Sequence, residues 1–435
     1  MVGIYEKKVS LVREILIVGG GASGILVAIN LARLNKEPIA LTIAEPRAIL
    51  GQGIAYSTSD LAHLLNVPAG RMSALVNDPL HFAAYMGCDG SKFISRADYG
   101  RYLLSTFLEF QGENPLLSFR HERVLIESIV QSGERYKAHG ETGLVGEFDS
   151  IVLATGHGQS NTSEVISAYS GDPRVVADVW RDLIPQTDGT MISVGTGLTF
   201  IDHALTHLRR STSNKAIGIS RTGWLPLPHL KKRAEPLPVP ESARHTAQGI
   251  REFIETSSDW RAAQDGVRHE LPEIWFNWSE KEKKKFMDEH LRWWNVHRHR
   301  VAPEIDEEVQ RMISSGRLRV LPGAIKKIER FDEGLRVFLS DGNSLDGAFL
   351  INSMGYRSGE DSPLIQSLLE DGAVTLGPLG MGISTNFPGF RIKTNNSRTQ
   401  NLFAIGSLLI GERFETTAVP ELKFQAHEIA KALLS

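Results

Sequence analysis

A glycine-rich turn near the start of the chain has the spacing that binds dinucleotides. Gly19, Gly21 and Gly24 follow an apolar run at residues 15–18 in the order G-x-G-x-x-G. The first glycine of such a turn makes a tight bend, the second lets the backbone approach a pyrophosphate, and the third allows close packing of a helix on a strand. The helix N-terminus that follows presents N–H groups to phosphate. We therefore predict that this turn, with Ser23 inside it, binds a dinucleotide.

An acidic residue indicates which dinucleotide fits. Glu45 stands 21 residues beyond Gly24, just after an apolar strand pattern at residues 39–43. A carboxylate there accepts hydrogen bonds from a ribose 2′-hydroxyl, and its charge repels a 2′-phosphate. A loop or an S-adenosylmethionine site could also use the glycines alone, but strand, helix and acid together favour FAD or NAD over NADP.

A second turn of the same kind lies in the middle of the chain. It keeps Gly195 and Gly197, includes Thr199, and has Phe200 where the third glycine would stand. Arg221 takes the place of the acid of the first unit, where a guanidinium would pair bidentately with the 2′-phosphate of NADPH. An exposed arginine in a turn is the alternative. The opposite charges predict that FAD is held by the first unit and NADPH by the second.

The elements around the two turns predict the fold. Apolar residues recur at helical spacing after each turn, and apolar runs at 39–43 and 216–220 complete two strand-helix-strand units. A small β-meander is expected between residues 123 and 154. We predict an α/β fold of two Rossmann-type domains, with the NADPH domain inserted into the FAD domain. The predicted limits are 1–160 and 345–435 for the FAD domain, 161–344 for the NADPH domain, and about 240–315 for a helical insertion.

Helix-start signals place three later helices. Ser279 and Glu282 form a possible capping box for a helix over residues 281–295. Pro303 and Pro420 could each occupy the first position of a further helix.

Composition excludes several classes of protein. The 435 residues are 41% apolar and 23% charged, as in ordinary globular proteins, and 48 Lys and Arg against 51 Asp and Glu leave a net charge of −3. That charge offers no basic field, so we predict no nucleic-acid partner. One cysteine, Cys88, allows neither an intrachain disulfide nor a zinc cluster of cysteine pairs. We expect no signal peptide in residues 1–14, no membrane span and a cytoplasmic location, with the oligomeric state left open.

Two later motifs resemble landmarks of a flavoprotein superfamily. Residues 154–156, Ala-Thr-Gly, and residues 402–406, Leu-Phe-Ala-Ile-Gly, resemble the two-dinucleotide-binding flavoproteins, in which the NADPH domain is inserted into the FAD domain. The resemblance implies that Thr155, Gly156 and Gly406 bind FAD. Ser407 departs from the pattern, because the superfamily usually has an acid there for the flavin ribityl chain.

A closer resemblance implies an activity. Residues 51–56, 65–72 and 297–300 resemble a bacterial family of FAD/NAD(P)-binding proteins related to flavin-dependent monooxygenases, urate hydroxylase among them. It implies an NADPH-dependent monooxygenase that uses O2 to hydroxylate a small polar, nitrogen-containing substrate through a flavin C4a-peroxide. The flavin would supply the oxygen chemistry, so no side-chain nucleophile is needed.

The resemblance also implies where reactive groups lie. Asn66 would stand near flavin C4a as a catalytic residue, although a turn-forming asparagine is an equal alternative. Gln52 and Tyr56 could line the flavin face, Gln52 in a catalytic role, and Tyr56 could equally fill the core. The N–H groups of Glu421 and Leu422, at the start of the last helix, would face the negative charge of reduced flavin.

An unusual run of aromatic and basic residues covers residues 293–300. Arg298 and Arg300 could bind phosphate or an anionic substrate, or they could be structural, with Trp293 and Trp294 packed inward. The histidines of this run lack acidic or cysteine neighbours, so we predict no metal site.

Other oxidoreductase chemistries fit less well. A disulfide reductase needs two cysteines near the flavin, and this chain has one. The fingerprint F-x-G-x-x-x-H-x-x-x-W of many monooxygenases is matched only weakly around Tyr169, Gly171 and Trp180. Two alternatives stay open: an NADPH dehydrogenase that passes electrons to a quinone or protein acceptor, and a non-enzymatic flavin redox sensor.

Overall fold

The computed structural model describes residues 12–230, 235–394 and 401–435. Most of the N-terminal segment expected to lack a signal peptide, residues 1–11, lies outside the described residues. No helix within the described ranges is both long and apolar enough to cross a membrane.

The first βαβ unit builds a seven-stranded sheet. Its strand order is β16-β17-β18-β7-β1-β2-β3, and β1 pairs in parallel with both β2 and β7. The predicted strand, turn and helix are confirmed in this unit, since α1 (Ala22–Leu34) begins within the glycine turn. This helix packs against α3 (Arg96–Glu113) and α13 (Val419–Leu434). The strands are β1 (Arg13–Val18), β2 (Ile39–Ala44), β3 (Leu117–Glu122), β7 (Ser150–Leu153), β16 (Thr385–Asn386), β17 (Arg391–Ile392) and β18 (Leu402–Ala404).

The second βαβ unit builds a separate five-stranded sheet. Its order is β11-β10-β9-β15-β8, with every neighbouring pair parallel. Apolar side chains cover both faces, as expected of a parallel sheet. The elements are β8 (Val175–Val176), β9 (Thr190–Val194), α5 (Leu198–Arg210), β10 (Lys215–Ser220), β11 (Leu318–Pro322) and β15 (Phe349–Asn352).

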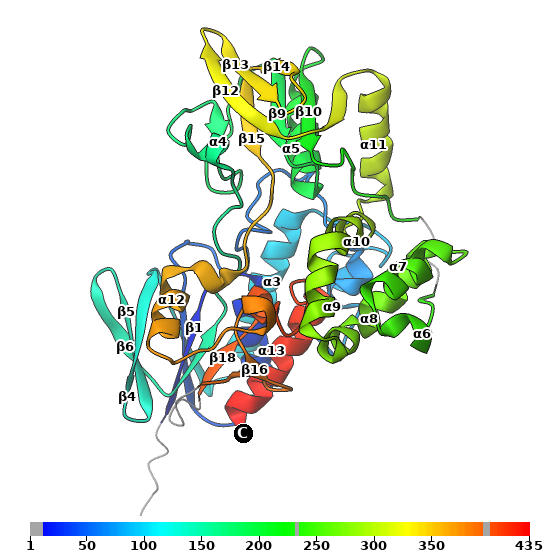
Figure 1. Cartoon of the computed structure of the whole chain (residues 1–435). Coiled ribbons are helices and arrows are strands. Elements are labelled where there is room, and N and C mark those ends of the chain that lie inside the picture. Colours follow the sequence, from blue (N-terminus) through cyan, green and yellow to red (C-terminus); the bar gives the residue numbers. More distant parts are fainter. Residues whose placement is uncertain (1–11, 231–234, 395–400) are drawn as a thin grey trace, which may run out of the picture.

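The chain leaves the first sheet once and returns to it. It passes from β7 to the second unit and comes back after β15 to form β16, β17 and β18 (Figure 1). The two crossing segments run side by side: Gly158 N donates to Arg357 O at 3.0 Å, and Asn161 N donates to Gly355 O at 2.8 Å. The second unit is therefore an insertion in the first. The assignment of the units to FAD and NADPH, with limits at 160 and 345, stays a prediction.

Each unit carries a three-stranded antiparallel sheet. The expected meander is present as β4 (Ile126–Ser132), β5 (Arg135–Gly140) and β6 (Gly143–Phe148). The second unit carries β12 (Ile325–Phe331), β13 (Gly334–Leu339) and β14 (Ser344–Gly347).

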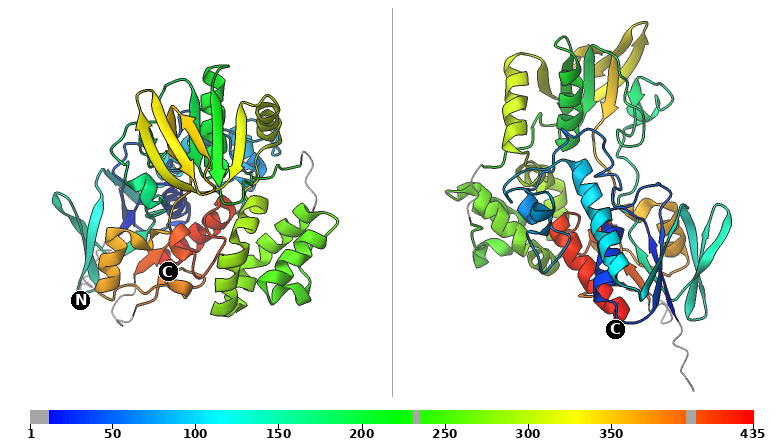
Figure 2. Two further views of the ribbon diagram at one scale, coloured as in Figure 1. Left: turned by 45° about the horizontal axis from the view of Figure 1, so that its top comes forward. Right: turned by 180° about the vertical axis from the view of Figure 1, so that it is seen from behind.

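The helical insertion packs beside the C-terminal helix, below the second unit (Figures 1 and 2). Its core is aromatic, with Trp275, Phe286 and Trp294 fully buried. The Phe414 ring stacks on Trp275 with ring centroids 5.0 Å apart. Its helices are α6 (Glu241–Arg244), α7 (Ala247–Thr256), α8 (Trp260–Asn277), α9 (Glu280–Lys285), a π-helical turn (Phe286–His290) and α10 (Leu291–Arg298).

The helix predicted over residues 281–295 is present but is interrupted by the π-helical turn. Ser279 caps it as expected, accepting from Glu282 N at 3.2 Å. The reciprocal half of the capping box is absent, because the Glu282 carboxylate instead accepts from Ala247 N at 2.7 Å. Pro303 opens α11 (Pro303–Ser314), as predicted.

The remaining helices are α2 (His81–Tyr85), α3 (Arg96–Glu113), α4 (Glu164–Ser167), α12 (Pro363–Glu370) and α13 (Val419–Leu434), with 3-10 turns at Ala69–Arg71, Gly359–Asp361, Pro378–Gly380 and Gly406–Leu409.

One glycine of the helical insertion lies directly against a crossing backbone segment. A Cβ atom on the buried Gly266 of α8 would lie 1.8 Å from the Leu237 carbonyl oxygen, where the chain crosses the helix. We expect Gly266→Ala to lower the free energy of unfolding by about 1–3 kcal/mol, because the clash outweighs alanine's higher helix propensity. Gly112→Ala in α3 is the control, since its Cβ would meet no atom within 4 Å. Urea unfolding of both variants measures the difference, and equal stability would contradict the clash.

Candidate cofactor site and active site

A cavity of about 630 Å3 opens beside the first glycine turn. Its volume lies within the range of ligand pockets, about 300–1,000 Å3. Most of the predicted FAD-binding residues line it, together with Arg47, His157 and Arg181, which the sequence did not single out. The predicted residues that line it are Gly19, Gly21, Ser23, Glu45, Gln52, Tyr56, Thr155, Gly156, Gly406 and Leu422.

The glycines are required by close backbone contacts. Gly19 has a φ of +103°, and a Cβ there would lie 2.3 Å from the Ala154 carbonyl oxygen. A Cβ on Gly24 would lie 2.0 Å from the Gly19 carbonyl oxygen. Gly24 is not part of the cavity wall, so its contribution is the helix packing expected of a third glycine. Gly21 is the N-cap residue of α1, which brings the start of that helix to the cavity.

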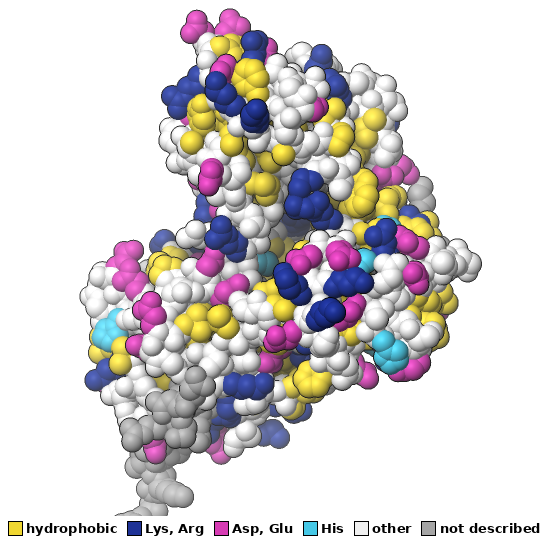
Figure 3. Space-filling model, in the orientation of Figure 1, with side chains coloured by type: hydrophobic (Ala, Val, Ile, Leu, Met, Phe, Trp, Pro, Cys, Tyr) yellow, Lys and Arg dark blue, Asp and Glu magenta, His cyan; other side chains and the backbone are white. Residues whose placement is uncertain are grey.

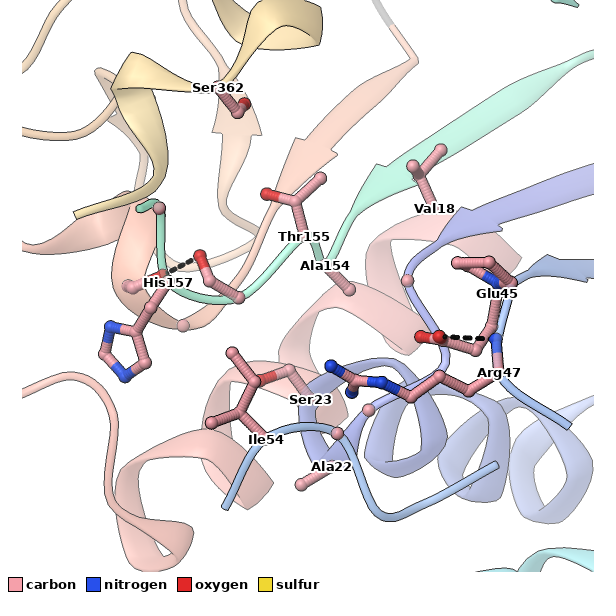
Figure 4. A pocket seen from close by; sticks show the side chains of 18 of the residues that line it. Val18, Ala22, Ser23, Glu45, Arg47, Ile54, Ala154, Thr155, His157 and Ser362 are labelled. Carbon is pink, nitrogen blue, oxygen red and sulfur yellow. Dashed lines mark hydrogen bonds between the residues drawn. The ribbon is translucent and has the colours of Figure 1, made fainter. Parts of the chain in front are cut away.

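The Glu45 carboxylate is held in place at one side of the cavity. Gly20 N donates to its Oε2 at 3.0 Å, and Arg47 N donates to its Oε1 at 3.1 Å. Each carboxylate oxygen keeps a second lone pair for a further donor. Figure 4 shows Glu45 and Arg47 together, away from His157. Glu45 is therefore placed to accept a ribose hydroxyl.

The opposite wall offers space and an unpaired hydroxyl. A Cβ on Gly156 would meet no atom within 4 Å, and the buried Thr155 Oγ1 has no hydrogen-bond partner among the described residues. Ser407 Oγ donates to the Gly156 carbonyl. The Gly406 N–H is already bonded to Gln425 Oε1 at 2.9 Å. The open space at Gly156, beside the start of α1 and the Glu45 carboxylate, fits the size and the polar groups of FAD.

Gln52 and Tyr56 form part of the same wall. The Tyr56 ring packs edge-on against Tyr99 with ring centroids 4.8 Å apart. Burial raises the pKa of Tyr56 to about 12, so its hydroxyl stays protonated near neutral pH. The sequence left open whether Tyr56 lines the cavity or fills the core. In the structure the same side chain does both.

Asn66 does not line this cavity. Its carbonyl oxygen accepts from His229 Nε2 at 3.0 Å, which ties its loop to the segment that follows β10 of the second unit. Burial lowers the pKa of His229 to about 4, so the ring is neutral and donates through Nε2. The catalytic role of Asn66 stays a prediction.

The expected free N–H groups at the last helix are not there. α13 begins at Val419, so Pro420 is its second residue. Because of this shift, Glu421 N and Leu422 N both donate to the Ala418 carbonyl oxygen, at 3.0 and 2.9 Å. The prediction that these two N–H groups are free was wrong, whereas cofactor binding by Glu421 and Leu422 stays a prediction. The Leu422 side chain lines the cavity, whereas the Glu421 carboxylate pairs with Arg268 at 2.7 Å.

Arg298 and Arg300 are buried in ion pairs away from the cavity. Arg298 Nε lies 3.0 Å from Glu415 Oε2, and Arg300 pairs with Asp265. Trp294 donates to the same Glu415 at 2.9 Å. These contacts, with both tryptophans buried, favour the structural alternative for residues 293–300. Substrate binding by the two arginines stays a prediction.

The second glycine turn has the same geometry as the first, except that Phe200 replaces the third glycine. Gly195 has a φ of +102° and lies against the Ser353 carbonyl, and Gly197 is the N-cap residue of α5. Phe200 fits at the third position because the neighbouring strand has Gly218, where a Cβ would lie 2.8 Å from the Phe200 ring. In this unit the helix carries the large residue, Phe200, and the strand carries the glycine, Gly218.

Arg221 follows β10 directly and is exposed. The chain after it is tied to the glycine turn, because Thr196 Oγ1 donates to the Trp224 carbonyl at 2.6 Å. Thr199 lies in the first turn of α5, partly exposed. No group of three potential metal-binding side chains occurs among the residues that the structure describes.

The comparisons agree with this arrangement. Residues 16–158 match the FAD-NAD(P)-binding family, in agreement with the predicted cofactor type of the first unit. No curated protein matches the chain in sequence.

Solved structures share the fold over nearly the whole chain. The reduced ornithine hydroxylase of Pseudomonas aeruginosa is 17% identical with a TM-score of 0.64, covering 98% of this chain and 99% of that one. The ornithine N-hydroxylase of Kutzneria sp. 744, with reduced FAD, NADP+ and L-ornithine, is 15% identical with a TM-score of 0.65, covering 97% and 99%. The bacillithiol disulfide reductase of Staphylococcus aureus is 13% identical with a TM-score of 0.57, covering 97% and 98%. These likenesses confirm the predicted α/β fold class.

The position of Glu45 predicts an effect on FAD affinity. We expect Glu45→Ala to weaken FAD binding about 10- to 100-fold, because a charge-assisted hydrogen bond contributes about 1.5–3 kcal/mol. Flavin fluorescence titration of the apoprotein measures the dissociation constant. Glu122→Gln, at an exposed ion pair with Arg120 on the edge strand β3, is the control and should bind FAD as the wild type does. Equal affinity of Glu45→Ala would remove this residue from the site.

The buried pair of Glu415 predicts a pH-dependent stability. Although burial acts in the opposite direction, Arg298 and Arg268 lower the pKa of Glu415 from 4.5 to about 2. The charged carboxylate therefore stabilises the fold above pH 4.5, and this contribution is lost as the pH falls toward 2.

We expect Glu415→Gln to lose about 3 kcal/mol of stability at pH 7 and progressively less below pH 4.5. Thermal unfolding of both proteins between pH 7 and pH 3 tests the trend. A difference that stays constant across that range would contradict it.

Proposed function

We propose that this chain is an FAD-dependent oxidoreductase that takes electrons from NADPH and hydroxylates a small polar, nitrogen-containing substrate with O2. The observation that carries the proposal is the pair of glycine turns with opposite charge beside them, Glu45 at the first and Arg221 at the second. The likeness to two ornithine hydroxylases along the whole chain supports the monooxygenase class.

The chain's own residues would divide the work as follows. The first glycine turn and the start of α1 would hold the pyrophosphate of FAD, and Glu45 its ribose. Gln52 and Tyr56 would line the cofactor, with Tyr56 as a hydrogen-bond donor that does not act as a base at neutral pH. FAD, when bound, supplies the electron transfer and the activation of oxygen.

Ser407 would replace the acid that usually meets the ribityl chain. Its hydroxyl donates to the Gly156 carbonyl, which leaves its lone pairs available to accept from a ribityl hydroxyl. Ser407 would thus keep a hydrogen-bond acceptor for the ribityl chain, as the acid of the superfamily does, but without a negative charge beside the flavin.

The likeness to a bacillithiol disulfide reductase does not support disulfide reduction by this chain. Cys88 is the single cysteine and is not part of the cavity wall. A cysteine pair within this chain is therefore excluded as the electron acceptor.

The test of the proposed function uses the purified FAD-bound protein. A panel of amines, amino acids and purines is screened for compounds that stimulate NADPH oxidation, and products are analysed by mass spectrometry under 18O2. We expect one compound to gain a single labelled oxygen atom. If every compound leaves NADPH oxidation coupled only to hydrogen peroxide, and a quinone accepts the electrons instead, the dehydrogenase alternative holds. If NADPH does not reduce the flavin at all, the redox-sensor alternative holds.

Arg221 predicts the nucleotide preference. We expect Arg221→Ala to raise the KM for NADPH about 10-fold or more, through the loss of at least about 1.4 kcal/mol from one charge-assisted contact. The KM for NADH should not change, because NADH lacks the 2′-phosphate. Lys215→Ala, exposed at the other end of β10, is the matched control. Steady-state kinetics with both nucleotides measure this, and parallel changes for NADPH and NADH would contradict the assignment.

A further inference from the structure

A polar cluster joins the two units away from the crossing segments. It consists of Arg96 and His63 from the first unit and Asp202 and Thr206 from α5 of the second, and we call it the interdomain latch. Arg96 lies 2.8 Å from the Asp202 carboxylate, and the His63 Nε2 lies 2.9 Å from the Thr206 hydroxyl. The side chains of Arg96 and Asp202 are only 13% and 11% exposed. Water therefore screens this pair less than a surface salt bridge.

The first unit holds its half of the latch rigidly. Arg96 Nε donates to the Leu64 carbonyl at 3.1 Å, and Arg96 N donates to the His63 carbonyl at 2.9 Å. The His63 Nδ1 lies 2.8 Å from the Thr58 hydroxyl, so both ring nitrogens are engaged. The arginine reaches the second unit from a fixed position and loses little side-chain freedom on pairing.

An aromatic contact covers the cluster. The Arg96 guanidinium lies 5.9 Å from the Trp180 ring centroid, and the same ring packs against His203 at 5.0 Å. Burial lowers the pKa of His203 to about 3, so it adds no positive charge beside Arg96. The pair of Arg96 and Asp202 therefore faces no competing cation from this ring.

Two short helical segments connect the latch to both cofactor sites. Arg96 is the first residue of α3, and four residues later a Cβ on Gly100 would lie 3.1 Å from Gln52 and from the Tyr56 carbonyl, in the cavity wall. On the other side, Asp202 is five residues from Gly197, the N-cap residue at the second glycine turn. At 1.5 Å per residue these separations are about 6 and 8 Å along the helix axes.

The crossing segments form a narrow ribbon between the two units. Gly158, Gln159 and Asn161 exchange backbone hydrogen bonds with residues 355–357, in two strands without side support from a wider sheet. Figure 1 shows α3 rising from the first unit toward α5, and the molecular surface is hollowed where the units meet (Figure 3). The helical insertion adds a second attachment to the first unit, because Arg268 pairs with Glu421 and Trp275 Nε1 donates to the Gly411 carbonyl. The latch is the attachment that lies on α5 itself, next to the second glycine turn.

We propose that the interdomain latch sets the orientation in which NADPH on the second unit reaches FAD on the first, with Arg96 and Asp202 as positioning residues. This inference rests on the proposed function. The step it serves moves a hydride, one proton with two electrons, from NADPH to FAD; NADPH becomes NADP+, and a solvent proton completes the reduced flavin. Transfer rates fall steeply with small displacements of the reacting atoms, so a loosened orientation should slow it.

The experiment compares Arg96→Gln, Asp202→Asn and the double variant as FAD-bound proteins. Anaerobic rapid mixing with saturating NADPH measures the rate of flavin reduction, and a titration measures NADPH affinity. We expect each single variant to reduce flavin about 10-fold or more slowly with NADPH affinity unchanged within about 3-fold. The double variant should be no slower than the singles, since both changes remove one interaction.

A second readout does not depend on activity. Hydrogen exchange, measured without NADPH, should become faster at the backbone N–H groups of Gly158, Asn161 and Arg357 in the same variants. Arg336→Gln removes an exposed pair with Asp346 inside the second unit and should change neither readout. Arg96→Lys keeps the charge and should restore part of the rate.

Each outcome separates the two claims. Wild-type reduction rates and wild-type exchange in Arg96→Gln would overturn the positioning role. A slow rate in Arg96→Gln that Arg96→Lys does not improve at all, with unchanged exchange, would overturn it as well. If NADPH fails to reduce even the wild-type flavin, the proposed function fails, whereas faster exchange in the variants would still support the latch as the holder of the two units.

Discussion

Contact between bare backbones at the first glycine turn is the constraint on which the cofactor site depends. The turn at Gly19 touches the end of β7 at Ala154, and α1 crosses β1 at Gly24, with no room for a side chain at either glycine. This close approach brings the start of α1 to the cavity and allows Gly20 N to donate to the Glu45 carboxylate. Under the proposed function, the turn would therefore bring together the groups that bind the phosphates and the ribose.

The second unit meets the same constraint with different residues. Gly195 reproduces the tight approach, this time to Ser353, and Gly218 makes room for Phe200. Under the proposed function, the two dinucleotides would lie on separate sheets, and hydride transfer would require a defined orientation of one unit relative to the other. Three features join the units: the crossing ribbon, the contacts of the helical insertion with the C-terminal segment, and the interdomain latch.

The helical insertion holds the segment of residues 411–417, and the end of that segment lines the cavity. Its aromatic core holds Phe414, and Trp275 Nε1 donates to the Gly411 carbonyl at 2.9 Å. The same segment continues to Glu415, buried between Arg298 and Arg268, and to Thr417, which lines the cavity. Buried charges there are paired rather than free, because an unpaired guanidinium in this position would carry a large desolvation cost.

The sequence alone determined the features that depend on local order: the two strand-turn-helix units, the glycine positions, the acid and the arginine at the strand ends, and the helix starts at Ser279 and Pro303. Spacing along the chain encodes these, since period and turn chemistry act over a few residues. The tertiary structure decided the rest. The carboxylate partners of Arg298 and Arg300 come from distant segments, and the start of α13 shifted by one residue, which engaged two N–H groups expected to be free. Such contacts arise only when segments far apart in the chain are packed together, so no local pattern records them.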